Sequence, residues 1–176
     1  MKAIRHFWRI SPEAATRCLR DASYFEDVIN GDEEGVQETF DVDKAWDAIH
    51  FVISANRAYP DQEEDADSIA LDHAIKGTKE FKGLSRGYGA AGMIGVDEVK
   101  KIASLFDGLS PDELKERFDP EAMDTAEVYP EIWLQEADAA WDYVRDHFER
   151  LREFYKRAAA EKSGVATWII DPPEPE

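Results

Sequence analysis

Three side chains that could bind a metal ion or exchange protons recur at helical spacing between residues 40 and 54, a segment that reads FDVDKAWDAIHFVIS. Asp43, Asp47 and His50 are four and three residues apart, so a helix would gather them on one flank. Two carboxylates and an imidazole could hold a divalent cation or form an acid/base pair. The alternative is structural: Asp43 favours the positive start of the helix, and Asp47 pairs with His50 one turn away.

A metal site would need more ligands than this flank supplies. Asp72 and His73 form the nearest further Asp–His pair, and nothing in the sequence brings it close. Cys18 is the only cysteine, which excludes an intramolecular disulfide and a thiolate cluster. We therefore predict no metal ion and no cofactor.

The segment is predicted to be a helix that begins after Asp41 as its N-cap. Whether His50 faces a cavity or only Asp47 stays open at this point, and we favour Asp47 as its neighbour. A ligand-contacting edge would use Asp43, Trp46, Asp47 and His50. The buried stripe of the helix is expected to contain the apolar residues that fall within ~40° of one another: Val42, Trp46, Ile49 and Ile53.

Two further segments could contact a ligand. GLSRGYGAAGMIGVDEV leads into a helix and could present backbone N–H groups to an anion, with specific contacts from Arg86 and Tyr88. It lacks both the GK[ST] of a P-loop and the GxGxxG spacing, and a tight packing loop is the alternative. In VYPEIW, Tyr129 and Trp133 could line a pocket or form a rigid turn that closes the core.

The sequence gives little support to nucleophilic catalysis. It contains no GxSxG motif, and Cys18 lies in a predicted core helix. The four histidines stand in unrelated contexts. A non-catalytic role is therefore favoured over an enzymatic one.

The helices and strands predicted from the sequence, which must position these residues, indicate an α+β domain with a small sheet. Alternation at 4–10 and the apolar run VATWII predict a strand at each end of the chain, and VQETF predicts a third. IALDHAI is ambiguous between helix and strand. One long helix, from about residue 134 to 160, has apolar residues over more than half its circumference and should organise the core. Shorter helices are predicted after Ser11-Pro12, through SYFEDVI, at 96–106 and after Ser110-Pro111.

The chain length of 176 residues fits one domain, which we place at 1–170 and follow with an acidic, proline-rich tail at 171–176. The net charge of -18, from 39 acidic and 21 basic residues, repels phosphate backbones and anionic lipid. We therefore expect no binding to nucleic acid or to a membrane. No apolar run approaches the ~20 residues of a membrane span, and a cytoplasmic location is expected.

The segments FDVDKAWDAIHF, GYGAAGMIGVDEV, LSPDELKERFDPEAM and VYPEIW, with the long helix and the final strand, resemble the YfbM-like family, domain of unknown function 1877. The resemblance covers about residues 4–170 and implies a bacterial α+β protein, but no activity. The chain departs from the family at Gly89-Ala90-Ala91-Gly92, where Gly-Pro-Ala-Arg is frequent, and in its acidic segment at 62–67.

Three functions follow as hypotheses, and the simplest is a purely structural domain or subunit, which predicts a large exposed apolar face in the monomer. The other two involve binding. The first is a non-catalytic binding or interaction protein whose acidic surface recognises a basic protein, for example in an immunity-like or antitoxin-like role. The second is a protein or enzyme that takes a small molecule in a pocket near Trp46 and His50, with Tyr88 and Tyr129 in its wall.

Overall fold

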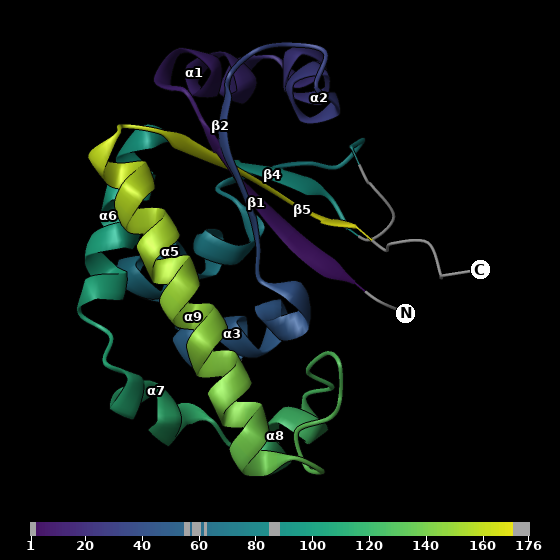
Figure 1. The fold of residues 1–176 in the computed structure, drawn as a ribbon, viewed down its shortest axis with the longest axis vertical. Coiled ribbons are helices and arrows are strands. Elements are labelled where there is room, and N and C mark those ends of the chain that lie inside the picture. Colours follow the sequence, from purple (N-terminus) through teal and green to yellow (C-terminus); the bar gives the residue numbers. More distant parts are fainter. Residues whose placement is uncertain (1–2, 55–56, 58–60, 62, 85–88, 171–176) are drawn as a thin grey trace.

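The computed structural model describes residues 3–54, 57, 61, 63–84 and 89–170 of the chain (Figure 1). Arg86, Tyr88 and the predicted tail at 171–176 lie outside the described residues. The described part has an α+β architecture in which helices cover a single antiparallel sheet.

The sheet brings the two ends of the chain together. Among the described residues it has five strands in the order β2-β1-β5-β4-β3. The first and last strands pair antiparallel along their whole length, with His6 opposite Trp168. The bounds of the strands are β1 Ile4–Ile10, β2 Val36–Asp41, β3 Lys79–Phe81, β4 Ala91–Ile94 and β5 Gly164–Ile170.

Helices pack on both faces of this sheet, which explains why the last strand is a continuous apolar run. Val165 and Ile169 of β5 belong to one core cluster, together with residues of the long helix α9, and Figure 1 shows α9 running at a steep angle to β5 from the start of that strand. Ala166 and Trp168, which point to the opposite face, belong to a second cluster with the first two helices. The helices are α1 Pro12–Arg20, α2 Ala22–Asn30, α3 Trp46–Ile53, α5 Ala66–Lys76, α6 Val96–Asp107, α7 Pro111–Arg117, α8 Pro120–Thr125 and α9 Ala137–Ala160.

Helix starts follow the capping residues of the sequence. The Ser11 hydroxyl accepts a hydrogen bond from the Ala14 amide at 3.3 Å, and the Ser110 hydroxyl accepts one from the Glu113 amide at 3.2 Å. Each serine satisfies a backbone N–H that has no partner within its helix. The predicted starts of α1 and α7 are therefore confirmed.

The helix predicted for residues 40–54 begins later than expected. Asp41 is the last residue of β2 and not an N-cap; its carboxylate accepts from the Asp43 amide at 2.9 Å. A 3-10 turn at Asp43–Ala45 then leads into α3. Asp43 has a φ of 48°, in the left-handed region that a right-handed α-helix excludes, so the α-helix starts only after this residue, at Trp46.

Two short strands, β3 before the glycine-rich segment and β4 within it, were not predicted from the sequence. A Cβ on Gly92 of β4 would lie 2.2 Å from the Lys76 carbonyl oxygen, so only glycine allows the end of α5 to approach this strand. The ambiguous segment IALDHAI is helical and forms most of α5.

The long helix is central to the core, as predicted. Phe148 and Tyr155 pack their rings against Phe106 of α6, with centroids 5.4 and 5.3 Å apart. No helix within the described ranges combines the length and the apolar character that crossing a membrane would require.

Candidate functional site

The apolar stripe of the segment 40–54 is buried as expected, but its three polar residues turn to three different partners. Val42, Trp46, Ile49 and Ile53 are each less than a tenth exposed. The first polar residue, Asp43, accepts a hydrogen bond from the hydroxyl of Tyr143 on α9 at 2.8 Å. Asp43 and Tyr143 also line a hollow of about 300 Å³ beside α9.

Asp47 accepts hydrogen bonds from the Arg57 guanidinium and from a backbone amide of the loop after α8. Its carboxylate accepts two hydrogen bonds from Arg57, at 3.0 and 3.1 Å, and one from the Tyr129 amide at 3.0 Å. Arg57 also donates to the Ala126 carbonyl at 3.2 Å. Asp47 is 7% exposed, so these bonds hold the chain after α8 against α3 in a site with little water.

The prediction that His50 pairs with Asp47 is wrong. His50 Nε2 lies 2.6 Å from Oδ1 of Asp72 on α5, and Lys76 lies 3.5 Å from the same carboxylate oxygen. Burial lowers the pKa of His50, and the Asp72 carboxylate opposes this only in part. Partial burial acts to raise the pKa of Asp72, but its bonds to His50 and Lys76 outweigh burial, and the pKa is lowered. Near neutral pH, both shifts favour a neutral imidazole beside an ionised carboxylate.

Tyr129 and Trp133 close the core beside this network. Tyr129 stacks on Trp46 with ring centroids 5.8 Å apart, and its hydroxyl accepts from the Ala3 amide at 2.9 Å. Trp133 is 1% exposed and donates to the Val128 carbonyl at 2.8 Å. Both side chains make contacts typical of a rigid turn.

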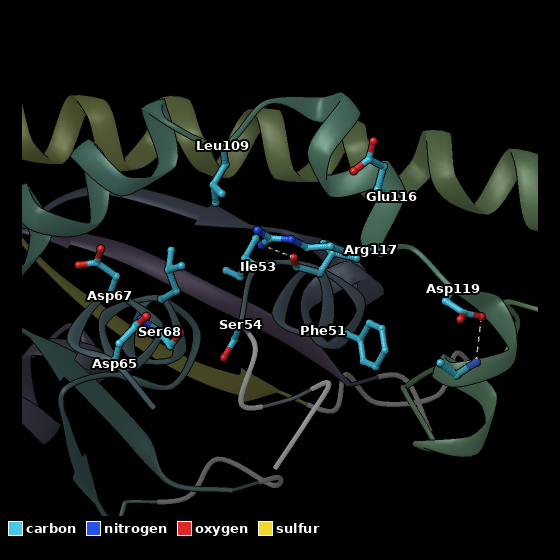
Figure 2. Close-up of a pocket in the computed structure, with 13 residues that line it drawn as sticks. Phe51, Ile53, Ser54, Asp65, Asp67, Ser68, Leu109, Glu116, Arg117 and Asp119 are labelled. Carbon is cyan, nitrogen blue, oxygen red and sulfur yellow. Dashed lines mark hydrogen bonds between the residues drawn. The ribbon is translucent and has the colours of Figure 1, made fainter. Parts of the chain in front are cut away.

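A pocket of about 450 Å³ lies at the C-terminal end of α3, between α5 and the α7–α8 region (Figure 2). Neither Trp46 nor His50 is among the described residues of its lining. The volume is in the range of small-molecule sites. The lining residues are Phe51, Val52, Ile53, Ser54, Asp65, Asp67, Ser68, Leu71, Leu109, Glu116, Arg117, Asp119 and Ala122.

The floor of this pocket is apolar and its rim is acidic. Phe51 and Leu71 are 5% and 9% exposed, whereas the four carboxylates of the lining are exposed. Hydrogen bonds from Ser68 lower the pKa of Asp65, which keeps this N-cap carboxylate ionised. The guanidinium of Arg117 is the one cation among the described lining residues, and it donates to the Val52 carbonyl at 3.2 Å.

The Ser54 hydroxyl in the wall of this pocket makes no hydrogen bond to the described residues. Ser54 is 1% exposed, and its Oγ has no hydrogen-bond partner among the described residues. Nearly all buried polar groups in proteins are hydrogen-bonded. A buried hydroxyl left without a partner in a pocket wall is consistent with a contact that a ligand completes.

Comparison with known proteins places the chain in a family. The model of a domain of unknown function, DUF1877, matches residues 1–168. The chain belongs to the DUF1877 family. No curated protein matches this member of the family.

A solved structure supports the fold of this DUF1877 member. The crystal structure of YfbM from Escherichia coli, a protein of unknown function, superposes with a TM-score of 0.70 at 21% identity. The match covers 95% of this chain and 99% of YfbM. At this identity the likeness concerns the fold alone.

The sequence analysis did not propose the acidic residues of the large pocket as ligand contacts in this DUF1877 member. The acidic segment at 62–67 was noted only as a departure from the family, and Glu116 and Asp119 lie in LSPDELKERFDPEAM, which contributed only to the resemblance and to a predicted helix. Asp65 and Asp119 could have been recognised in the sequence as helix N-caps. Asp65 accepts a hydrogen bond from the Ser68 amide, and Asp119 accepts from the amides of Glu121 and Ala122. Capping fixes a carboxylate in place, but it does not reveal which distant helix will face it.

Proposed function

We propose that this protein is a non-catalytic binding protein that holds a cationic ligand in the pocket between α3, α5 and α7. The proposal is carried by one observation, the apolar floor of Phe51 and Leu71 beneath four exposed carboxylates. An apolar floor favours the hydrocarbon part of a ligand, and the carboxylates favour positive charge over negative.

The side chains of the pocket support binding better than catalysis. Its described lining contains no histidine, cysteine or tyrosine. Asp65, whose pKa is lowered by its bonds to Ser68, is a poor general acid near neutral pH. Asp119 accepts hydrogen bonds from the Glu121 and Ala122 amides at 3.1 Å, which commits one of its oxygens to the helix. These groups suit the holding of charge rather than the transfer of protons.

Amide chemical shifts can test this proposal. Labelled protein is titrated with hexylammonium, methylammonium and hexanoate. We expect hexylammonium alone to shift amide signals around Ser54, Ser68 and Leu109, because only it offers both a positive charge and an apolar chain. Equal shifts with methylammonium, or shifts spread evenly over the surface, would show general counterion attraction and refute the pocket.

A basic protein partner is a second candidate, favoured by the net charge of -18. An excess of one sign speeds the encounter with a partner of the opposite sign. An immunity-like or antitoxin-like role against a basic toxin is one form of this candidate. The tagged protein should then retain a basic protein from the host extract at ~0.1 M salt, where charges more than ~10 Å apart are already largely screened. Recovery of no basic protein at that salt concentration would remove this candidate.

A further inference from the structure

The carboxylates of the pocket stand at two separate ends. Asp65 and Asp67 come from the start of α5, whereas Glu116 and Asp119 come from the end of α7 and the residue that caps α8. Figure 2 shows the first pair on one side of the pocket and the second pair on the other. A ligand with a single charge could satisfy only one of these ends.

Between the two ends the wall is apolar except for the guanidinium of Arg117, which Figure 2 shows reaching toward Ile53. Phe51 and Leu71 are buried, and Leu109 is half-buried. In Figure 2, Leu109 lies between the acidic pair of α5 and Glu116. Methylene groups placed along these side chains would lose contact with water at no cost in polar desolvation.

The single buried polar group of the lining without a partner also lies between the ends. Figure 2 places Ser54 between the side chains of Asp65 and Phe51. Its hydroxyl is the polar atom described above as having no partner among the described residues. A hydroxyl oxygen can accept a hydrogen bond from an ammonium group.

Basic side chains offset this acidic rim only in part. Arg117 donates to the backbone of Val52, and Lys101, which is outside the lining, lies 3.9 Å from a carboxylate oxygen of Asp67. The described lining therefore contains four carboxylates and one guanidinium. The excess of negative charge is present at both ends.

We propose that the ligand is a linear aliphatic polyamine with an ammonium group at each end. This inference rests on the proposed cation-binding function and specifies its ligand. One terminal ammonium lies at Asp65 and Asp67 and the other at Glu116 and Asp119, with the methylene chain over the apolar wall. In a triamine, the central secondary ammonium donates to the hydroxyl of Ser54.

Calorimetry with a matched series of amines tests the inference. The probes are hexylammonium, the α,ω-diaminoalkanes with four to eight carbons, and spermidine as a triamine. We expect one diamine length to bind about fivefold more tightly than hexylammonium, the fold-change that one exposed ion pair can supply. If no diamine binds more tightly than hexylammonium, the polyamine inference is wrong although the cation pocket stands. If no amine binds at all, the proposed function fails as well.

A pair of charge-matched variants separates the pocket from the general field. Asp67→Asn with Glu116→Gln removes one carboxylate at each end, and Glu64→Gln with Glu113→Gln removes two exposed carboxylates outside the lining. The first double variant should bring the diamine down to the affinity of hexylammonium, and the second should keep the diamine preference. Equal loss in both variants would assign the preference to net charge and overturn the inference.

Ser54→Ala tests the middle of the pocket. We expect this variant to weaken spermidine binding about tenfold or more, since a hydrogen bond to a charged group is lost, while diamine binding stays unchanged. Chemical denaturation should show an equal or greater free energy of unfolding, because the buried hydroxyl has no partner to lose among the described residues. An unchanged affinity for spermidine would remove Ser54 from the ligand contacts and reject the triamine geometry.

Discussion

At the scale of single residues, the polar side chains of the segment 40–54 bind partners on separate elements. Asp43 accepts from Tyr143 of α9, Asp47 binds Arg57, and His50 contacts Asp72 of α5. The residues have the helical spacing that suggested a common site, but each side chain contacts a different part of the structure. These residues therefore join the helix to its neighbours.

Replacing Asp47 should destabilise the protein more than replacing Asp43. Asp47→Asn removes a charged acceptor that is 7% exposed and leaves Arg57 without its carboxylate. We expect the free energy of unfolding to fall by about 2 kcal/mol, the value of a hydrogen bond to a buried charge. Asp43→Asn serves as the control, because Asp43 is only half-buried. Urea denaturation of both variants checks the order, and a larger loss for Asp43→Asn would contradict it.

The pair of His50 and Asp72 predicts how stability depends on pH. Burial lowers the pKa of His50 in the folded protein, so below about 6.5, the ordinary value for histidine, the unfolded chain takes up more protons. Stability is therefore expected to be complete above that pH and to decrease as the pH falls through it. The pKa of Asp72 is also lowered, which adds a second loss below the usual aspartate range.

The variant His50→Gln isolates the histidine in this pH dependence. The urea midpoint of the variant should fall less between pH 7.5 and 5.5 than that of the unchanged protein. Some dependence should remain, because burial also lowers the pKa values of His6 and His147. An identical slope in both proteins would show that His50 does not contribute.

At the scale of elements, close packing depends on a few positions where a side chain does not fit. The end of α5 meets β4 at Gly92, where an added Cβ would lie 2.2 Å from the Lys76 carbonyl oxygen. This oxygen is backbone and cannot rotate away. Helix and strand must therefore separate if Gly92 is replaced.

Gly92→Ala should destabilise the protein by about 3 kcal/mol or more, the upper range for overpacking a core. Gly83→Ala is the matched control: apart from its chain neighbours, no heavy atom of the described residues lies within 4 Å of its added Cβ, and its φ is not in the left-handed region. We expect thermal unfolding of this control to stay within about 0.5 kcal/mol of the parent protein, as for most surface changes. Similar losses in both variants would contradict the close approach of α5 and β4.

At the scale of the whole molecule, the net charge of -18 acts against compactness. Like charges on the folded surface repel one another more strongly than in the expanded chain. Ion pairs such as Arg157 with Glu38, at 2.6 Å, offset only part of this repulsion.

Added salt should therefore stabilise the fold. We expect the urea midpoint at pH 7.5 to rise between 0.02 and 0.3 M sodium chloride, because the screening length falls from about 20 Å to about 6 Å. The doubly neutralised variant Glu64→Gln with Glu113→Gln should show a smaller rise. A midpoint that falls with salt would mean that surface ion pairs, rather than repulsion, dominate the electrostatic free energy.

Much of the fold was predictable because its signals are local. Ser11 and Ser110 cap helices through their own next turn, and the apolar period of α9 repeats within one element. The terminal strands were visible as short apolar patterns. The strands β3 and β4 were not, because three or four residues carry too little periodicity, and these strands depend on pairing with each other and, for β4, with β5.

The sequence by itself determined the α+β class, the buried stripe of α3, the central long helix and the net charge of -18. These follow from periodicity, capping and charge, which need no knowledge of distant contacts. Only the tertiary structure decided that His50 meets Asp72 and that the start of α5 faces the end of α7. These contacts join residues 22 or more positions apart, and their geometry depends on how the helices pack on the sheet.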